Sequence, residues 1–411
     1  MPKPELLAPA GNAENLQIAL RYGADAVYVG GQDFSLRAHA ANFDLPELAR
    51  AVQLTHDLGK KIYLTVNIYA HQQDIDGLSV YLEQVAKIGP DALIVSDLGV
   101  VSLARQYAPD IPLHISTQAN TLNWQATEVW RSLGAERVIL GRELSLNEVA
   151  YITANTKLET EIFVHGALCV AYSGRCLLSN YLTGRDANRG DCSQSCRWQY
   201  SLMEEKRPGH YLPIEEDIHG TYIMNSKDLC LLPILPQILQ SGIAALKIEG
   251  RNKSAYYVAN VVRIYRQALD AAWPAGEQFV FQPEWLDELN KISNREYTVG
   301  FAGQAPNANL QRYQSSYPLR SYDFAATLEE VQPGRLRLRQ RNHVQIGDML
   351  EILLPDGHNI NHTVDLLTDI DAKPLAAANR PYQDFYLPID QQILEQLAGS
   401  PLPLIVRRLA R

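Results

Sequence analysis

Sulfur, charge and long apolar runs are all scarce in this sequence. The 411 residues include five cysteines and four methionines, and only 20% of them are Asp, Glu, Lys or Arg. No apolar run reaches the ~18 residues of a membrane span, and the opening MPKPELLAPAG lacks a basic region followed by an apolar one. The net charge of −9 excludes a basic nucleic-acid coat, so any RNA contact has to be local. We therefore expect a cytoplasmic protein that does not enter a membrane.

A helix-to-strand joint repeats along the first two thirds of the chain. The segments GADAVYVG, GPDALIVS, GAERVILG and GIAALKIE each start with a glycine after an amphipathic stretch, at Gly23, Gly89, Gly134 and Gly242. This order is typical of a helix, a left-handed glycine cap and a buried strand. The strand parts are continuous apolar runs, which favours parallel strands covered on both faces.

Four further apolar segments fit between these repeats, namely ELLAPA, KIYLTV, PLHIST and EIFVHG. Eight strands separated by helical stretches over about 250 residues match an α/β fold of the (β/α)8 TIM-like barrel type. The alternative is a doubly wound open sheet, but no G-x-G-x-x-G follows the first strand. We therefore predict a barrel over residues 1–273.

The composition changes after Trp273. Residues 274–317 combine prolines, aromatic residues and loop-forming residues, which predicts a linker. From 318 to 411, short segments alternate with Gly, Pro, Asp and Asn turns. This pattern predicts a small C-terminal domain that is an antiparallel β-barrel or sandwich.

Polar residues end the predicted strands and should converge at the barrel mouth, where barrel enzymes carry their chemistry. They are Tyr28, Asn67, Asp97, Gln118, Arg142, Glu143, His165, Lys247, Glu249 and Arg251. His165, Glu143 and Glu249 are the candidate catalytic groups, with His165 as the proton-transfer group. A hydrogen bond to a nearby cofactor and a purely structural role are the alternatives for His165. Each of the other residues also fits an ordinary strand-end cap or ion pair.

Four of the five cysteines fall within 28 residues, in an insertion predicted at about 166–230 after the seventh strand. They are Cys169, Cys176, Cys192 and Cys196, separated by six, fifteen and three residues. Four thiolates can hold zinc or an iron–sulfur cluster, and the six-residue gap favours the cluster because structural zinc sites usually pair closer cysteines. Cys230 begins an apolar helix and is interpreted as a core thiol.

The motifs EIFVHGALCVAYSGRCLLSNY, GADAVYVGG, HISTQAN and DANRGDCSQSCRW resemble those of the U32 peptidase family, across about residues 3–270. No H-E-x-x-H, G-x-S-x-G or papain-like cysteine motif supports peptide hydrolysis, which remains the alternative function. A scaffold with a structural metal is a third reading. Several family members are RNA or quinone hydroxylation proteins with a 4Fe-4S cluster. The resemblance is greatest to those that form 5-hydroxyuridine at the wobble uridine of tRNA with prephenate.

The resemblance implies a site with several components. It makes Cys169, Cys176, Cys192 and Cys196 the cluster ligands, although Cys230 could replace Cys196. A pocket for prephenate, a small dicarboxylate, would use guanidinium groups. The candidate substrate-binding residues are Arg37, Asn67, Gln118, Arg142 and Arg251. An electron-donor protein is a candidate partner.

A row of arginines in the C-terminal domain offers a candidate RNA contact. In GRLRLRQRN, the residues Arg335, Arg337, Arg339 and Arg341 share one face if the segment is a strand. Phosphate contact would explain four cations on one side, and a solvated strand face is the alternative.

Overall fold

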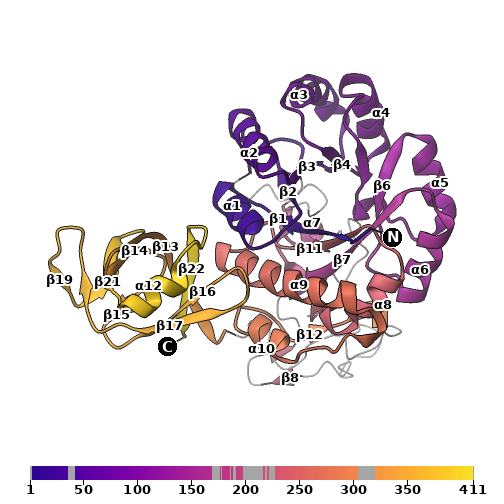
Figure 1. Cartoon of the computed structure of the whole chain (residues 1–411). Coiled ribbons are helices and arrows are strands. Elements are labelled where there is room, and N and C mark those ends of the chain that lie inside the picture. The colour runs from indigo at the N-terminus through magenta and orange to yellow at the C-terminus, as the bar shows by residue number, and fades with distance from the viewer. Residues whose placement is uncertain are drawn as a thin grey trace, which may run out of the picture.

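The computed structural model describes residues 2–35, 42–168, 176, 178–185, 187, 191–197, 216–217, 220–221, 227–303 and 320–410. It forms a large α/β region and a smaller β domain that lies against its side (Figure 1). In the described residues, no helix has both the length and the apolar character needed to span a bilayer.

The larger region is a closed parallel barrel. Its strands are β1 (Glu5–Pro9), β2 (Ala26–Gly30), β3 (Lys61–Val66), β4 (Ala92–Val95), β5 (Leu113–Ile115), β6 (Ala135–Ile139), β7 (Glu159–Ala167) and β11 (Ala245–Ile248). Consecutive strands pair in parallel from β1 to β7, and β11 closes the ring by pairing with both β7 and β1. All eight predicted strands and the barrel itself are thus confirmed.

Helices alternate with these strands and surround the barrel (Figure 1). They are α1 (Ala13–Arg21), α2 (Leu45–Asp57), α3 (Ile75–Ile88), α4 (Leu98–Tyr107), α5 (Trp124–Ser132), α6 (Leu146–Asn155), α8 (Leu235–Gln240) and α9 (Ala255–Ala275). The four repeated glycines all have positive φ, between 74° and 110°, as the helix-to-strand joint requires. Asp44 with Glu47 and Ser145 with Glu148 form reciprocal capping boxes that start α2 and α6.

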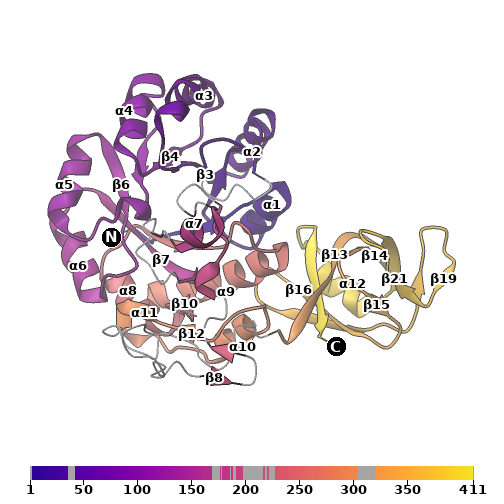
Figure 2. The same cartoon turned by 180° about the vertical axis from the view of Figure 1, so that it is seen from behind.

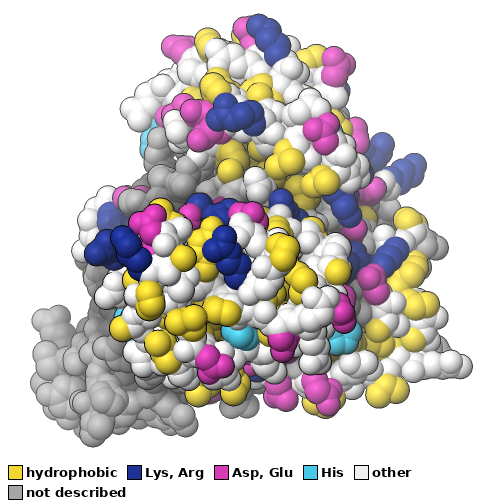
Figure 3. All heavy atoms as spheres, turned by 60° about the vertical axis from the view of Figure 1, so that its left-hand side comes forward, with side chains coloured by type: hydrophobic (Ala, Val, Ile, Leu, Met, Phe, Trp, Pro, Cys, Tyr) yellow, Lys and Arg dark blue, Asp and Glu magenta, His cyan; other side chains and the backbone are white. Residues whose placement is uncertain are grey.

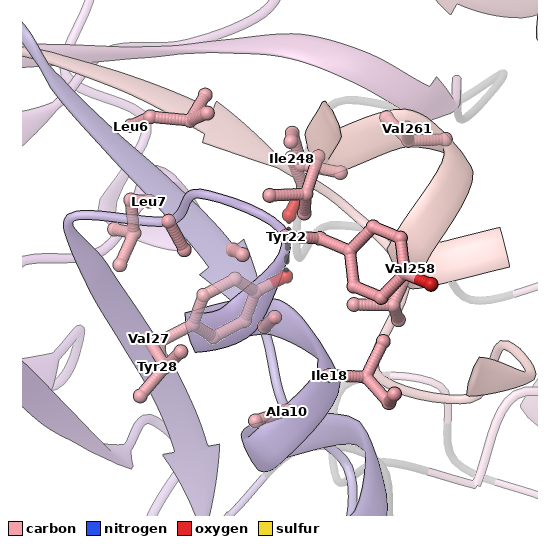
Figure 4. Close-up of a cluster of buried hydrophobic side chains, with 14 of the residues drawn as sticks. Leu6, Leu7, Ala10, Ile18, Tyr22, Val27, Tyr28, Ile248, Val258 and Val261 are labelled. Atoms are coloured by element: carbon pink, nitrogen blue, oxygen red, sulfur yellow. Dashed lines mark hydrogen bonds between the residues drawn. The ribbon is translucent and has the colours of Figure 1, made fainter. Parts of the chain in front are cut away.

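The barrel core packs between the strands and the outer helices (Figure 4). Val258 and Val261 of α9 and Ile18 of α1 are fully buried beside the strand residues Leu6 and Ile248. Each such side chain contributes about 1.5–3 kcal/mol by leaving water. This packing fixes the helix layer and therefore the loops that connect it to the strands.

The insertion between β7 and β11 contains α7 (Leu178–Thr183), the short strands β8 (Glu216–Asp217) and β9 (Gly220–Thr221), and β10 (Asp228–Cys230). β10 runs antiparallel to β7 and extends the barrel sheet outward. Helix α7 lies over one end of the barrel, in front of the strands in Figure 2 and behind them in Figure 1.

The predicted linker differs from what the structure shows. Helix α9 continues to Ala275, and the following segment forms α10 (Glu284–Asn290), β12 (Tyr297–Thr298) and α11 (Gly300–Gly303). Trp285 is 5% exposed and stacks on Phe279 with ring centroids 5.9 Å apart, while β12 pairs with β10. Residues 276–303 therefore belong to the barrel region, because their aromatic side chains are buried against it.

The C-terminal residues 320–410 form the predicted antiparallel domain. Its strands are β13 (Tyr322–Gln332), β14 (Arg335–Gln340), β15 (Val344–Gln345), β16 (Met349–Leu353), β17 (Asn359–Thr363), β18 (Leu367–Thr368), β19 (Pro374–Leu375), β20 (Ala377–Ala378), β21 (Asp384–Pro388) and β22 (Leu404–Leu409), with helix α12 (Gln391–Leu397). The main sheet has the order β17-β16-β22-β13-β14-β21-β18-β19 and curves into a half-barrel around residues such as Leu338 and Phe385.

A buried polar interface joins the two regions. The Tyr22 hydroxyl of the barrel donates to the Leu353 carbonyl at 2.7 Å and accepts from the Ile405 amide at 3.0 Å. Arg263 and Arg407, both 0% exposed, contact the Glu288 carboxylate at 2.8 and 2.9 Å. Since these groups have lost their water, the pairing holds the β domain in one orientation on the barrel.

Candidate functional site

Two predicted substrate-binding amides meet at the carboxyl ends of β3 and β5. Asn67 donates its side-chain N–H to the Gln118 side-chain oxygen at 2.7 Å, and the Ser116 hydroxyl donates to the same oxygen at 3.0 Å. The hydroxyl of Tyr69 donates to the Gln118 carbonyl at 3.2 Å. The side-chain oxygen of Gln118 thus accepts two hydrogen bonds, which fixes the orientation of the amide. Its NH2 group is a donor, and no described residue accepts a hydrogen bond from that group.

Arg251 at the mouth is held by hydroxyl groups. Its Nη1 donates to Ser35 Oγ at 2.8 Å and to Thr65 Oγ1 at 3.1 Å, and the residue is 5% exposed. A Cβ at Gly30 would lie 1.9 Å from that nitrogen, so only glycine fits there. Arg251 therefore ties the end of the last barrel strand to β2 and β3. Arg37, its predicted companion, lies outside the described residues.

Arg142 connects the ends of β6 and β7. Its Nη1 donates to the Ala167 carbonyl at 2.6 Å, and its guanidinium carbon lies 3.9 Å from the centre of the Phe163 ring. The buried Nε has no hydrogen-bond partner within the described part of the chain. Arg142 thus sits at the base of the cysteine loop with one donor unused, whereas Glu143 beside it is half-buried.

Tyr28, Lys247 and Glu249 form a further group in the barrel. The Tyr28 hydroxyl donates to the Ile248 carbonyl at 3.0 Å (dashed in Figure 4) and lies 3.3 Å from a Glu249 carboxylate oxygen. The Lys247 ammonium lies 4.4 Å from the centre of the Tyr28 ring. Burial lowers the pKa of Lys247, and the nearby carboxylates oppose that shift. Glu249 directly follows β11, at its carboxyl end.

His165 does not line the mouth as a proton-transfer group would. Its ring packs against three tyrosine rings, those of Tyr257, Tyr265 and Tyr297, with centroids 5.2–6.0 Å away. The residue is 1% exposed, and neither ring nitrogen has a hydrogen-bond partner among the described residues. Burial lowers the pKa of His165 to about 3, so the imidazole is neutral at physiological pH. This environment favours the structural interpretation.

Three of the predicted ligand cysteines are described, and they flank helix α7: Cys176 precedes it, and Cys192 and Cys196 follow it. Cys176, Cys192 and Cys196 are all partly exposed, and the Gln194 amide donates to the Cys192 sulfur at 3.3 Å. Hydrogen bonds from amides to thiolate sulfurs help to set the reduction potential of a metal cluster that the thiolates bind. Across the described residues, no three His, Cys, Asp or Glu side chains are grouped closely enough to hold a metal ion. Cys169 lies outside those residues, so the predicted ligand quartet stays a prediction.

The loop that carries these thiols is ordered by its own polar contacts. Ser179 Oγ accepts from the Ser193 amide at 2.9 Å and donates to the Arg185 carbonyl at 2.8 Å. Arg185 also pairs with Asp191 at 2.7 Å. These contacts bring the segment around Cys192 back against α7, at the end of the barrel that α7 covers.

Cys230 is a core thiol, as the sequence predicts, but it ends strand β10 instead of beginning a helix. It is 2% exposed, and its sulfur lies 3.7 Å from the Tyr265 hydroxyl. Burial raises the pKa of the Cys230 thiol to about 11. A buried, protonated thiol is a poor metal ligand, which favours Cys196 over Cys230 as the fourth ligand.

Sequence reasoning missed an ionic cluster inside the barrel. Glu161, 0% exposed, lies 2.8 Å from the Lys247 ammonium and 3.2 Å from Arg137, and Arg137 also contacts Glu5 at 2.9 Å. The Tyr63 hydroxyl donates to Glu5 at 2.8 Å. The residues Glu5, Tyr63, Arg137 and Glu161 lie early or midway in their strands. Lys247, which was predicted at the mouth, lies near the end of β11 and pairs with Glu161. The signal was present as charged letters inside apolar runs, such as "AERVI" and "ETEIF".

The arginine row of β14 has the predicted alternation but is paired within the protein. Leu336 and Leu338 face the core, and Arg337 contacts Glu330 at 3.0 Å and Asp384 at 3.5 Å. Arg339 contacts Asp384 at 3.0 Å, Arg341 pairs with Glu14 of the barrel, and Arg335 lies 4.2 Å from the Tyr386 ring centre. Figure 3, in which the side of the molecule that carries the β domain comes forward, shows basic, acidic and apolar side chains interspersed.

Comparison with known proteins agrees with this architecture. The family model "Peptidase family U32" matches residues 11–312, and "Peptidase family U32 C-terminal domain" matches residues 320–397. The chain belongs to peptidase family U32. The U32 barrel model extends through the segment that sequence analysis took for a linker, in agreement with its packing on α9. The second match covers most of the β domain.

Curated U32 relatives span nearly the whole chain. The tRNA hydroxylation protein P1 of Bacillus subtilis is 42% identical over 396 residues, covering 95% of this chain and 93% of that protein. The tRNA hydroxylation protein P of Escherichia coli is 38% identical and covers 95% of both chains. A 23S rRNA 5-hydroxycytidine synthase of Escherichia coli is 39% identical over 267 residues, which are 65% of this chain and 39% of that protein.

Proposed function

We propose that this U32 protein is an RNA-modifying enzyme that hydroxylates tRNA, forming 5-hydroxyuridine at the wobble uridine with prephenate as a required metabolite. The observation that carries the proposal is the similarity to two tRNA hydroxylation proteins over 95% of the chain, barrel and β domain together. The similarity of the barrel to an rRNA hydroxycytidine synthase supports pyrimidine hydroxylation as the shared chemistry.

Replacing a C–H bond by C–OH at carbon 5 of a pyrimidine adds one oxygen atom and is a two-electron oxidation. With dioxygen as the oxygen source, the second oxygen atom leaves as water and takes up two further electrons, so the reaction needs a redox centre and an electron donor. We propose that Cys169, Cys176, Cys192 and Cys196 hold a 4Fe-4S cluster, with zinc as the alternative metal. When bound, such a cluster supplies one-electron transfer beside the substrate. The partly exposed thiols and the Gln194 amide at the Cys192 sulfur support this donor set. An electron-donor protein would be its partner.

The residues at the mouth have roles that follow from their contacts. Gln118 is oriented by Asn67 and Ser116 and presents its amide N–H to a carbonyl or carboxylate of the substrate. The half-buried guanidinium of Arg142 carries the positive charge that suits a carboxylate of prephenate. Arg251 shapes the mouth through Ser35 and Thr65. Glu143 and Glu249 are the remaining candidates for proton transfer, since His165 is enclosed by tyrosines.

Nucleoside mass spectrometry tests the proposed reaction. We expect tRNA from a deletion strain to lose 5-hydroxyuridine derivatives and a plasmid-borne copy to restore them. Unchanged modification in the deletion strain, with no parallel enzyme present, would overturn the proposal. Peptide cleavage by the purified protein that persists after loss of its metal would instead favour the hydrolase that the family name describes.

Anaerobic purification with iron and sulfide assays tests the cofactor. The expected result is about four irons and four sulfides per chain, lost in each alanine variant of the four loop cysteines and kept in Cys230→Ala. Tightly bound zinc without sulfide would show that the metal is structural.

A further inference from the structure

A cavity of about 350 Å³ lies where the barrel meets the β domain. One wall comes from the loop after β11 and the start of α9, another from the segment after α10, and the third from the start of the β domain. The lining residues are Asn252, Lys253, Ser254, Tyr256, Tyr257, Ile292, Ser293, Arg320, Tyr322, Phe324, Arg341 and Asn342. The cavity therefore exists only because the two regions are docked.

The charge of this cavity has one sign. Its lining includes three cations, Lys253, Arg320 and Arg341, and no carboxylate, in a chain whose net charge is −9. Arg320 pairs with Asp323 and Arg341 with Glu14, but neither acidic residue lines the cavity. The amino terminus of the 21-residue helix α9 lies at the same wall and adds positive potential. The cavity thus suits an anion.

The floor of the cavity is aromatic. Tyr256 and Phe324 pack with centroids 6.2 Å apart, and the Arg341 guanidinium lies 5.5 Å from the Phe324 ring centre. Tyr256 is 4% exposed and donates its hydroxyl to the Lys291 carbonyl at 3.0 Å, which fixes its ring. Phe324 is half-buried and lines the cavity. Cations beside an aromatic ring are the elements that bind phosphate and base in single-stranded nucleic acids.

The cavity lies beside the barrel mouth. Lys253 follows Arg251 by two residues, and its amide donates to the Gly250 carbonyl at 2.9 Å, within the loop after β11. The three cations of the cavity thus lie on the side of the barrel where the loop after β11 leaves the mouth, so a nucleic acid bound at the mouth can reach them.

We propose that this cavity binds the phosphate and base of an unpaired RNA nucleotide next to the one that is modified. The inference rests on the proposed tRNA hydroxylation, in which the wobble uridine and its neighbours are unpaired in the anticodon loop. It gives the β domain a function, because Arg320, Phe324 and Arg341 place the RNA that the barrel modifies.

The proposal is tested by measuring how tightly an in vitro transcribed tRNA binds the full-length, metal-loaded protein. Binding is measured by fluorescence anisotropy at several salt concentrations. The variant Lys253→Gln with Arg320→Gln removes two exposed cations, and we expect about tenfold weaker binding and a smaller salt dependence. Phe324→Leu should weaken binding about fivefold with an unchanged salt dependence. The matched control is Lys87→Gln with Lys157→Gln, two exposed lysines near the amino-terminal ends of β4 and β7, which should bind like the wild type.

The outcomes separate this inference from the proposed function. If the wild type hydroxylates tRNA but the Lys253→Gln, Arg320→Gln variant binds RNA as tightly as the control pair, the cavity does not bind RNA. If that variant loses affinity for prephenate and keeps its affinity for RNA, the anion is the small dicarboxylate and the RNA assignment is wrong. If the wild type neither binds nor modifies tRNA, the proposed function fails together with the inference. Thermal unfolding midpoints equal to that of the wild type would show that the variants are folded.

Discussion

The interior of the barrel and its mouth both carry polar residues, but of different kinds. Inside the barrel, Arg137, Glu161 and Lys247 are charged, buried and paired with one another. At the mouth, Gln118 and Arg142 retain donors that no described residue accepts. The difference teaches that pairing satisfies a buried charge within the fold, whereas a positioned donor on a partly exposed side chain, such as the amide of Gln118, is available to a ligand.

The largest effect is expected inside the barrel. Glu161→Gln leaves Lys247 buried without its carboxylate, and we expect a loss of about 3 kcal/mol or more in the free energy of unfolding. Glu159→Gln is the matched control: Glu159 also contacts Arg137, at 2.7 Å, but its side chain is 58% exposed. The control variant should lose less than about 1 kcal/mol in the free energy of unfolding. Equal losses in urea denaturation would refute the distinction between buried and exposed pairs.

The next effect concerns His165, which is buried and neutral. The pKa of His165 is about 3 in the folded state and 6.5 in the unfolded chain. As pH falls below 6.5, the unfolded chain therefore binds a proton at this residue that the folded chain does not bind, which favours unfolding. Its contribution to stability is complete above pH 6.5 and declines toward pH 3. At pH 5 the decline should be about 2 kcal/mol.

The comparison of wild type with His165→Asn isolates this contribution. The variant cannot take up that proton. Between pH 7 and pH 5, its free energy of unfolding should therefore fall by about 2 kcal/mol less than that of the wild type. Parallel pH profiles for the two proteins would mean that His165 titrates normally in the folded state and that its tyrosine cage is open to water.

A smaller effect is expected at the mouth. Gln118→Ala removes the oriented amide while leaving the barrel interior intact, so we expect about a tenfold loss of hydroxylation, equal to ~1.4 kcal/mol, with little change in stability. Quantitative mass spectrometry of the modified nucleoside measures it. Normal hydroxylation together with a large loss of stability would show that Gln118 is structural, like the residues inside the barrel.

The smallest effect is expected for the arginine row of the β domain. Arg337 is neutralised by Glu330 and Asp384, so Arg337→Gln should change tRNA affinity by less than about twofold. A tenfold loss in the anisotropy assay would instead confirm the phosphate contact that sequence analysis considered for this row.

The sequence predicts the barrel well because its signals are local. Each repeated glycine marks a helix end, and each apolar run marks a buried strand. The packing of 276–303 was not predicted, because the burial of Trp285 and Phe279 depends on contacts with α9 that lie far away in sequence. The same limit applies to His165, whose tyrosine cage is assembled from α9 and β12, and to the cavity between the two regions.

The candidate site was predicted in part. Asn67 and Gln118 are brought together as expected, since strand ends in a barrel share one mouth. Arg251 was expected to bind substrate, yet its contacts to Ser35 and Thr65 depend on loops whose course the sequence does not specify. The separation of Cys230 from the loop cysteines was visible in sequence as the apolar surroundings of Cys230.

The most direct test of the account compares two cysteines in vivo. A deletion strain would carry the wild-type gene, Cys192→Ala or Cys230→Ala, and 5-hydroxyuridine derivatives in its tRNA would be measured by mass spectrometry. We predict that the wild-type gene and Cys230→Ala restore the modification and that Cys192→Ala does not. Restoration by Cys192→Ala, or loss of modification in Cys230→Ala with normal protein levels, would contradict the assignment of the loop thiols to the reaction.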